Sequence, residues 1–275
     1  MSRRKRVLAA LVMAPVAIGS VLWLPTPLLA AAAAGLMMIG LWEWTLLSGT
    51  TGRLARAGYL AANIAIMTAL AWAAGHGLGE LVAVATWGSL WWLLALAWLW
   101  RFDFASGGER WTHALKLLAG SLCVIPAWSA LCWLHAGAGN GPAWTLFALL
   151  IVWVADTGAY FAGVRFGRHK LAPRISPGKS WEGFAGGLLA TALLAVVAVP
   201  MLGLAWQRAG ELLLLTGVAF LFSVAGDLFE SLLKRHAGAK DSSDLIPGHG
   251  GVLDRVDSLL AALPVFAVGK LWLGL

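Results

Sequence analysis

Long apolar stretches alternate with short polar connectors along this chain. A helix that spans a bilayer needs about 20 mostly apolar residues. Nine segments approach or meet that length, at 7–24, 28–47, 57–74, 79–100, 115–134, 143–164, 184–205, 211–233 and 252–273. Proline and glycine punctuate the connectors between them, as expected for turns. The pattern predicts an all-α polytopic membrane protein with about nine transmembrane helices, forming a single membrane domain over residues 1–275.

The composition supports this prediction. Hydrophobic residues make up 60% of the chain and charged residues only 12%, whereas soluble domains carry about 25% charged residues. The 17 tryptophans suit the headgroup level of a bilayer, and the 33 glycines allow close helix contacts. The two cysteines, Cys123 and Cys132, lie inside an apolar stretch and form neither a disulfide framework nor a zinc motif.

The positive charges predict an orientation. If the N-terminus is cytoplasmic and the nine segments alternate, all of the 20 Lys and Arg residues except Arg208 and Lys270 fall inside. The sequence therefore predicts a multi-pass protein of the inner (plasma) membrane with its C-terminus outside. The basic start and the alanine run 30–34 resemble a signal peptide. The run 7–24 is long for a signal core, however, which favours a retained first helix.

Polar residues concentrate in the last third. The stretch Ser231–Ser258 holds four acids, four bases and two histidines. Because polar groups are costly beside lipid, such a cluster indicates function. We therefore expect residues 1–140 to be mainly scaffold, and the helices and cytoplasmic loops of 141–275 to carry the catalytic site.

Helical spacing gathers these groups on two faces. Polar residues of the eighth segment recur at i, i+3, i+4 and i+7, and those of the ninth at i, i+3 and i+4. These residues are Asp227, Glu230, Ser231 and Lys234, and then Asp254, Asp257 and Ser258. Carboxylates, cations and a glycine-rich turn at a helix start suit a polyphosphate with Mg²⁺. Simpler interpretations are a helix-dipole partner and a structural ion pair.

A second polar cluster lies upstream. Asp156 falls within the sixth segment, and the basic loop 165–183 follows it. The loop could instead bind anionic lipid headgroups, and Asp156 could form a packing hydrogen bond with Tyr160. Residues 176–182 of this loop lack the residue spacing of a P-loop. Glu43, near the end of the second segment, fits an interface position as well as a functional one.

These residues resemble a family signature, that of the phosphatidate cytidylyltransferases, also called CDP-diacylglycerol synthases. The match comprises Ser231, Lys234-Arg235, Lys240-Asp241, the Pro-Gly-His-Gly-Gly turn at 247–251 and Asp254-Arg255-Val256-Asp257. The stretches 155–163 and 176–183 are also similar to the family. The motifs cover about a third of the chain, and the first half is similar only in its apolar helices.

The resemblance implies a nucleotidyltransferase in phospholipid biosynthesis. Phosphatidate would attack the α-phosphorus of CTP, giving CDP-diacylglycerol and pyrophosphate, with Mg²⁺ and a second metal ion as candidate cofactors. The implied catalytic residues are Asp227, Lys234, Arg235, Lys240, Asp241, His249, Asp254, Arg255 and Asp257, of which Asp227, Asp254 and Asp257 would bind metal. The implied substrate-binding residues are Asp156, Arg174, Ser176, Lys179, Ser180, Ser231, Gly250 and Gly251.

The implied partners are CTP, phosphatidate, the lipid bilayer and a second copy in a homodimer, with no nucleic acid. Two alternatives stay open. One is a cytidylyltransferase or kinase that acts on another lipid, such as an isoprenoid alcohol. The other is an ion-coupled transporter, which would place acids near the bilayer midplane, often in inverted repeats.

Overall fold

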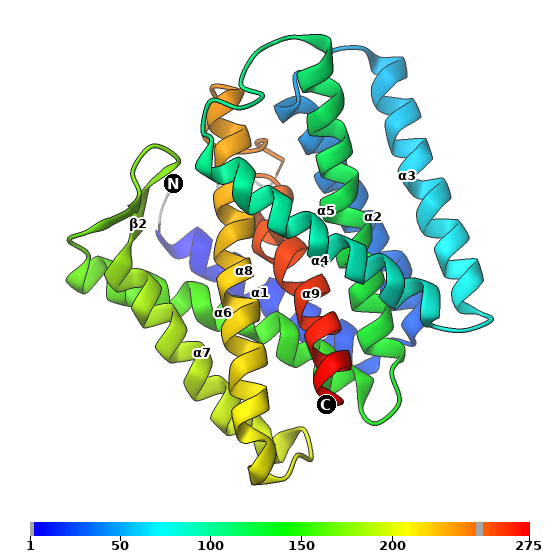
Figure 1. The fold of residues 1–275 in the computed structure, drawn as a ribbon, viewed down its shortest axis with the longest axis vertical. Coiled ribbons are helices and arrows are strands. Elements are labelled where there is room, and N and C mark those ends of the chain that lie inside the picture. The colour runs from blue at the N-terminus through cyan, green and yellow to red at the C-terminus, as the bar shows by residue number, and fades with distance from the viewer. Residues whose placement is uncertain (1–2, 246–249) are drawn as a thin grey trace.

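The structure, a computed structural model, describes residues 3–245 and 250–275 of the chain. Within these ranges it consists of helices and one short hairpin (Figure 1). The helices are α1 (Arg3–Trp23), α2 (Thr26–Leu47), α3 (Arg53–Ala74), α4 (Gly79–Trp100), α5 (Arg110–Ala136), α6 (Gly141–Phe166), α7 (Trp181–Met201), α8 (Ala209–His236) and α9 (Leu253–Leu273). A single 3₁₀ turn, Trp206–Arg208, precedes α8.

These elements confirm the predicted all-α membrane architecture. Each of the nine apolar segments corresponds to one helix, although the predicted 184–205 runs four residues past the end of α7 at Met201. Eight of the helices, α2 to α9, are long and apolar enough to cross a membrane, whereas the apolar part described for α1 is the shorter Met13–Trp23. The chain is therefore a multi-pass membrane protein. Helices α5 and α8 extend beyond their apolar segments, and their added turns carry polar residues such as Arg110 and His236.

The centre of the fold is formed by α5 and α9. Helix α9 packs against α8, α5 and α4, and α5 also packs against α4 and α2. An aromatic cluster fills the space beside them. The ring centroid of Phe229 lies 5.8 Å from that of Trp92 and 5.3 Å from that of Trp98. The buried Trp92 indole donates a hydrogen bond to the Leu260 carbonyl at 3.1 Å, so α4 holds α9 as well as α8.

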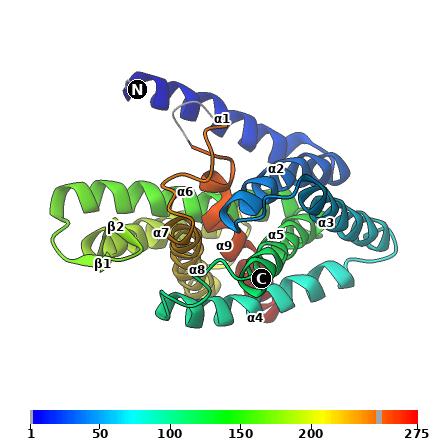
Figure 2. The same cartoon turned by 90° about the horizontal axis from the view of Figure 1, so that it is seen from above.

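Small residues bring α6 and α7 into close antiparallel contact. A Cβ atom added at Gly186 would lie 2.2 Å from the Cβ of Ala162, and one added at Gly158 would lie 2.8 Å from the Gly186 carbonyl oxygen. Glycines at such crossings let transmembrane helices approach closely. The pair forms one side of the molecule beside α8 (Figures 1 and 2).

A β-hairpin connects these two helices. Strand β1 (Lys170–Ala172) pairs antiparallel with β2 (Ser176–Ser180). The sequence predicted only a loop here, because the strands are short and polar and lack an alternating pattern. Ser180 ends the hairpin and begins α7, since its hydroxyl accepts a hydrogen bond from Gly183 N at 3.1 Å. This cap fixes the hairpin to the start of the helix.

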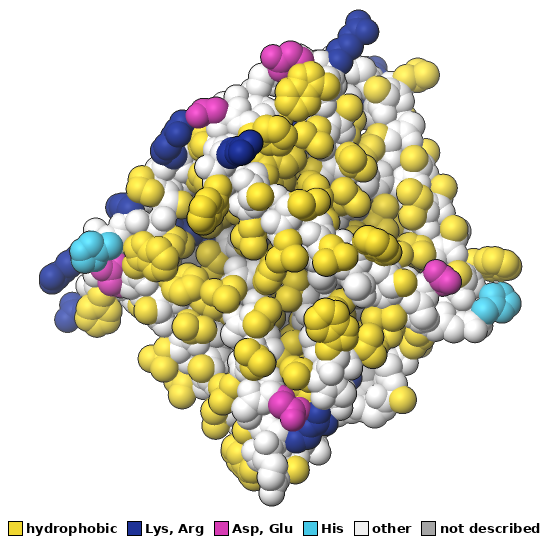
Figure 3. All heavy atoms as spheres, viewed as in Figure 1, with side chains coloured by type: hydrophobic (Ala, Val, Ile, Leu, Met, Phe, Trp, Pro, Cys, Tyr) yellow, Lys and Arg dark blue, Asp and Glu magenta, His cyan; other side chains and the backbone are white. Residues whose placement is uncertain are grey.

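Apolar side chains dominate the visible surface, and the charged ones lie mostly near its edges (Figure 3). Exposed tryptophans mark several helix ends, including Trp72 of α3, Trp100 of α4, Trp181 of α7 and Trp272 of α9. An indole ring suits the boundary between lipid tails and headgroups. The surface is therefore that of a lipid-facing protein with interfacial tryptophans.

Candidate active site

A cavity of about 210 Å³ opens where α6, α7, α8 and the hairpin meet. Among the polar side chains that line it, five come from four separate elements, α6, β2, α8 and α9. They are Asp156, Lys179, Ser180, Asp227 and Ser258. Aromatic and small residues such as Phe184, Phe220 and Gly183 complete the wall. The cavity thus combines an apolar lining with a few converging polar groups, as ligand sites commonly do.

An ion pair lies at the edge of this cavity. Lys179 Nζ of β2 is 2.5 Å from Asp227 Oδ2 of α8, and both side chains stay about a quarter exposed. The other carboxylate oxygen of Asp227 accepts a hydrogen bond from the Ser231 hydroxyl at 3.3 Å, one turn along the same helix. The hairpin therefore places Lys179, from the upstream cluster, against the acidic face of α8.

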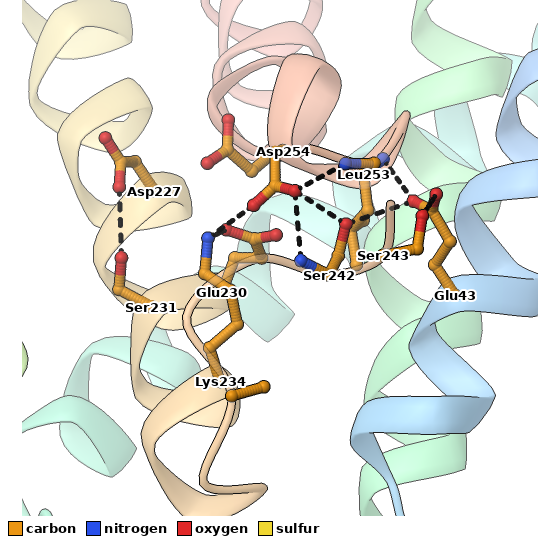
Figure 4. Close-up of polar contacts among 12 residues, drawn as sticks. Glu43, Asp227, Glu230, Ser231, Lys234, Ser242, Ser243, Leu253 and Asp254 are labelled. Atoms are coloured by element: carbon orange, nitrogen blue, oxygen red, sulfur yellow. Dashed lines mark hydrogen bonds and ion pairs between the residues drawn. The ribbon is translucent and has the colours of Figure 1, made fainter. Parts of the chain in front are cut away.

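The polar face of α8 meets that of α9. Lys234 of α8 forms ion pairs with Glu230 of its own helix and with Asp254 of α9, the latter at 2.6 Å (Figure 4). Gly226 allows the approach, because a Cβ there would lie 2.5 Å from the Asp257 carbonyl oxygen. The Lys234 side chain is only 10% exposed, so this bridge is largely removed from water.

Asp257 and Asp156 both interact with the Lys179–Asp227 ion pair. Asp257 interacts electrostatically with Asp227, Lys179 and Lys234. Asp156 interacts with Asp227, Lys179 and Arg255. Asp156 and Asp257 thus interact with cations that already form direct ion pairs, Lys179 with Asp227 and Lys234 with Asp254.

Asp254 organises the start of α9. Its Oδ2 accepts hydrogen bonds from Ser242 N at 3.0 Å, the Ser242 hydroxyl at 2.8 Å and Gly251 N at 2.8 Å (Figure 4). Gly250 has a φ of 76°, and a Cβ there would lie 2.7 Å from Asp254 Oδ2. A side chain at position 250 would therefore be strained and crowded, which explains the glycine.

Glu43 is the residue whose place the sequence predicted least well. It lies on α2, in the first half of the chain, and is 0% exposed. Its carboxylate accepts hydrogen bonds from Val252 N, Leu253 N and the hydroxyl of Ser243 (Figure 4). The available signal was an acid within an apolar run, and such acids are expensive beside lipid unless they have partners.

Other predicted residues lie around the site with different contacts. Arg174 pairs with Asp103 at 3.2 Å and stacks over the Phe102 ring, with its Cζ atom 4.2 Å from the ring centroid. Arg235 donates to the Ile175 carbonyl at 3.1 Å, which ties the end of α8 to the hairpin. Ser176 begins β2.

The connector between α8 and α9 carries three more of the predicted residues. Lys240 and Asp241 are exposed there. His249 lies outside the described residues.

The carboxylates suit a magnesium ion that binds together with a substrate. Within 3–245 and 250–275, no three Asp, Glu, His or Cys side chains gather closely enough to hold a metal by themselves. Mg²⁺ is commonly held by one or two carboxylates, with water and substrate phosphates completing its coordination. Asp227 and Asp257, whose negative charges repel each other, fit that arrangement. Asp254 Oδ1 accepts a hydrogen bond only from Lys234 among the contacts described and could contribute as well.

Comparison with known proteins gives the class to which this fold and site belong. A family model described as "Cytidylyltransferase family" matches residues 4–271. The chain belongs to this family, a class of nucleotidyltransferases.

Two relatives match the chain along nearly its whole length. A phosphatidate cytidylyltransferase of Pseudomonas aeruginosa is 42% identical, with 98% of this chain and 97% of the relative covered. One from Haemophilus influenzae is 35% identical, with 96% and 97% covered. A third, from Staphylococcus epidermidis, is 48% identical but covers 47% of this chain and 49% of the relative. The suspected resemblance is thereby confirmed.

Proposed function

We propose that this protein transfers the cytidylyl group of CTP to phosphatidate. An oxygen of the phosphatidate phosphate forms a bond to the α-phosphorus of CTP, the bond from that phosphorus to the β-phosphate oxygen breaks, and pyrophosphate leaves. The observation that carries the proposal is the cavity in which Lys179 and Asp227 meet, in a chain 42% identical over nearly its full length to a phosphatidate cytidylyltransferase.

The residues of the site have roles that follow from their charges. Such transfers depend on positioning and charge neutralisation more than on a covalent nucleophile. Lys179, at the rim of the cavity, can exchange its contact with Asp227 for a phosphate oxygen. Arg255, which lies near Asp156, can supply a second positive charge. Lys234 is held by two carboxylates and keeps α8 and α9 in register.

We propose Mg²⁺ as the cofactor, held by Asp227 and Asp257 with Asp254 beside them. When bound, the ion would neutralise phosphate charge and polarise the phosphorus–oxygen bonds. Without it, the carboxylates of this site would repel a triphosphate. A second metal ion would find the same kind of donors.

We further propose that the site faces the cytoplasm from the inner membrane and that the protein is a homodimer. The uneven distribution of Lys and Arg supports the orientation, and a cytoplasmic site would meet CTP directly. The resemblance to the family supports the dimer. Cysteine-accessibility labelling at Ser176→Cys and light scattering of the detergent-solubilised protein test these two statements.

The decisive experiment incubates the purified protein with radiolabelled CTP, phosphatidate and Mg²⁺. We expect labelled CDP-diacylglycerol and release of pyrophosphate, with neither in the Asp227→Asn variant. A parallel reaction with an isoprenoid alcohol or its phosphate tests the alternative acceptor. If folded wild-type protein forms no CDP-diacylglycerol, or prefers the isoprenoid acceptor, the proposal is wrong.

A further inference from the structure

Helix α9, which carries Asp254 and Asp257, has no cap of its own. The residue before its first turn is Val252, whose side chain cannot accept a hydrogen bond, and the glycines at 250 and 251 precede it. The first backbone N–H groups of a helix have no partner within the helix. They therefore need an acceptor from elsewhere, or from water.

Glu43 supplies that acceptor from α2. Its Oε1 accepts from Val252 N at 3.0 Å, and its Oε2 accepts from Leu253 N at 2.6 Å. A carboxylate at a helix N-terminus is also favoured by the helix dipole. Both backbone groups and the carboxylate are buried, so water cannot replace the contact when it is lost.

The same carboxylate is joined to Asp254 through the connector between α8 and α9. The Ser242 hydroxyl lies 3.2 Å from Glu43 Oε2 and 2.8 Å from Asp254 Oδ2, and Ser243 donates to Glu43 Oε1 at 2.5 Å (Figure 4). Gly251 passes between these groups, since a Cβ there would lie 2.4 Å from Glu43 Oε1. Glu43 thus fixes both the connector and the start of α9, the helix that carries Asp254 and Asp257.

We infer that Glu43 is a positioning residue for the transfer reaction: by capping α9 from α2 it holds Asp254 and Asp257 where Mg²⁺–CTP binds. This inference rests on the proposed function. Glu43 contacts the connector and the start of α9, and it does not line the cavity. It therefore acts through Ser242 and the α9 backbone. Loss of Glu43 should weaken nucleotide binding more than lipid binding, because the acids of α9 are the proposed ligands of the metal ion that binds with the CTP phosphates.

The test compares Glu43→Gln with the control Thr45→Val. Thr45 is equally buried on α2, but its hydroxyl donates only to the Trp42 carbonyl of its own helix. Hydrogen exchange of the detergent-solubilised protein reads the cap directly. We expect exchange in a peptide spanning 250–256 to rise at least about tenfold in Glu43→Gln, the effect of losing one hydrogen bond to a charged acceptor, and to stay unchanged in the control.

Kinetic constants separate positioning from a purely structural role. In Glu43→Gln we expect the half-saturating Mg²⁺ concentration and the KM for CTP each to rise about tenfold, with the KM for phosphatidate within about twofold of wild type. Simple loss of folded protein would lower the maximal rate and leave every half-saturation constant unchanged, and that result would overturn the inference. A direct titration with Mg²⁺–CTP in the absence of phosphatidate should show the same weakening.

Ser242→Ala tests the route from Glu43 to Asp254. If Glu43 acts through Ser242, the double variant Glu43→Gln/Ser242→Ala weakens Mg²⁺–CTP binding by less than the product of the two single effects. Independent effects that multiply would refute this route. If wild-type protein makes no CDP-diacylglycerol, the proposed function fails. The exchange measurement still decides the cap, because unchanged exchange in Glu43→Gln overturns the inference.

Discussion

Replacing Lys234 by methionine should destabilise the protein more than any other single change at the site. Methionine keeps much of the length and apolar volume of lysine but removes the charge. Lys234 is the counter-charge that both Glu230 and Asp254 contact, and these carboxylates are 1% and 8% exposed. The change therefore leaves two acids unpaired in a region largely closed to water.

The structure divides the cost unequally between the two acids. Asp254 keeps its hydrogen bonds from Ser242 and Gly251, whereas Glu230 makes its ion pair with Lys234 and with no other described residue. Removing one partner of a buried ion pair costs about 3–5 kcal/mol. For a chain of this size, that loss lowers the Tm by roughly 6–20 °C, at about 2–4 °C per kcal/mol.

Thermal unfolding in detergent, followed by intrinsic tryptophan fluorescence, measures the effect. The double variant Lys234→Met/Glu230→Gln should recover more than half of the lost Tm, because the charge left without a partner is removed as well. Lys240→Met is the matched control, since Lys240 is exposed and its replacement should change the Tm by less than about 3 °C. A loss of under about 1 kcal/mol in Lys234→Met, or no recovery in the double variant, would refute this reasoning.

Three further outcomes are expected. Asp227→Asn and Asp254→Asn should each lower the transfer rate at least about 100-fold while leaving expression intact, and near-normal rates in both would make the metal assignment wrong. Removal of divalent ions with EDTA should abolish transfer, and added Mg²⁺ should restore it; activity that persists in EDTA would exclude the cofactor. Gly186→Val should lower the Tm, because a Cβ at 186 meets Ala162 at 2.2 Å, whereas Gly217→Ala, with open space around it, should leave the Tm equal or higher.

The apolar helices could be predicted closely from the sequence, because each one must satisfy its backbone internally and present about 20 apolar residues to lipid. The segment 79–100 coincides with α4 residue for residue. The hairpin was missed because its strands are short and polar, so that no alternation marks them. Its effect on the site is large, since it carries Lys179 to Asp227 of α8.

The site followed from local spacing only within each helix. The i, i+3 and i+7 pattern placed Asp227 and Lys234 on one face of α8. In the structure, Asp227 pairs with Lys179 of the hairpin and Lys234 pairs with Asp254 of α9. Spacing within one helix, however, says nothing about which helix a side chain meets. The contact of Glu43 with Leu253 joins residues 210 positions apart and depends on the packing of α2 against α9.

The balance of charge in the site gives an independent reason to expect a metal ion. In the described part of the chain, the acids Asp156, Asp227, Glu230, Asp254 and Asp257 interact with one another across α6, α8 and α9. Fewer cations balance them, chiefly Lys179, Lys234 and Arg255. A triphosphate adds further negative charge, and in a site shielded from water that repulsion is far stronger than in bulk solvent. Positive charge that enters with the nucleotide would relieve this repulsion, and a divalent ion bound to its phosphates would supply that charge.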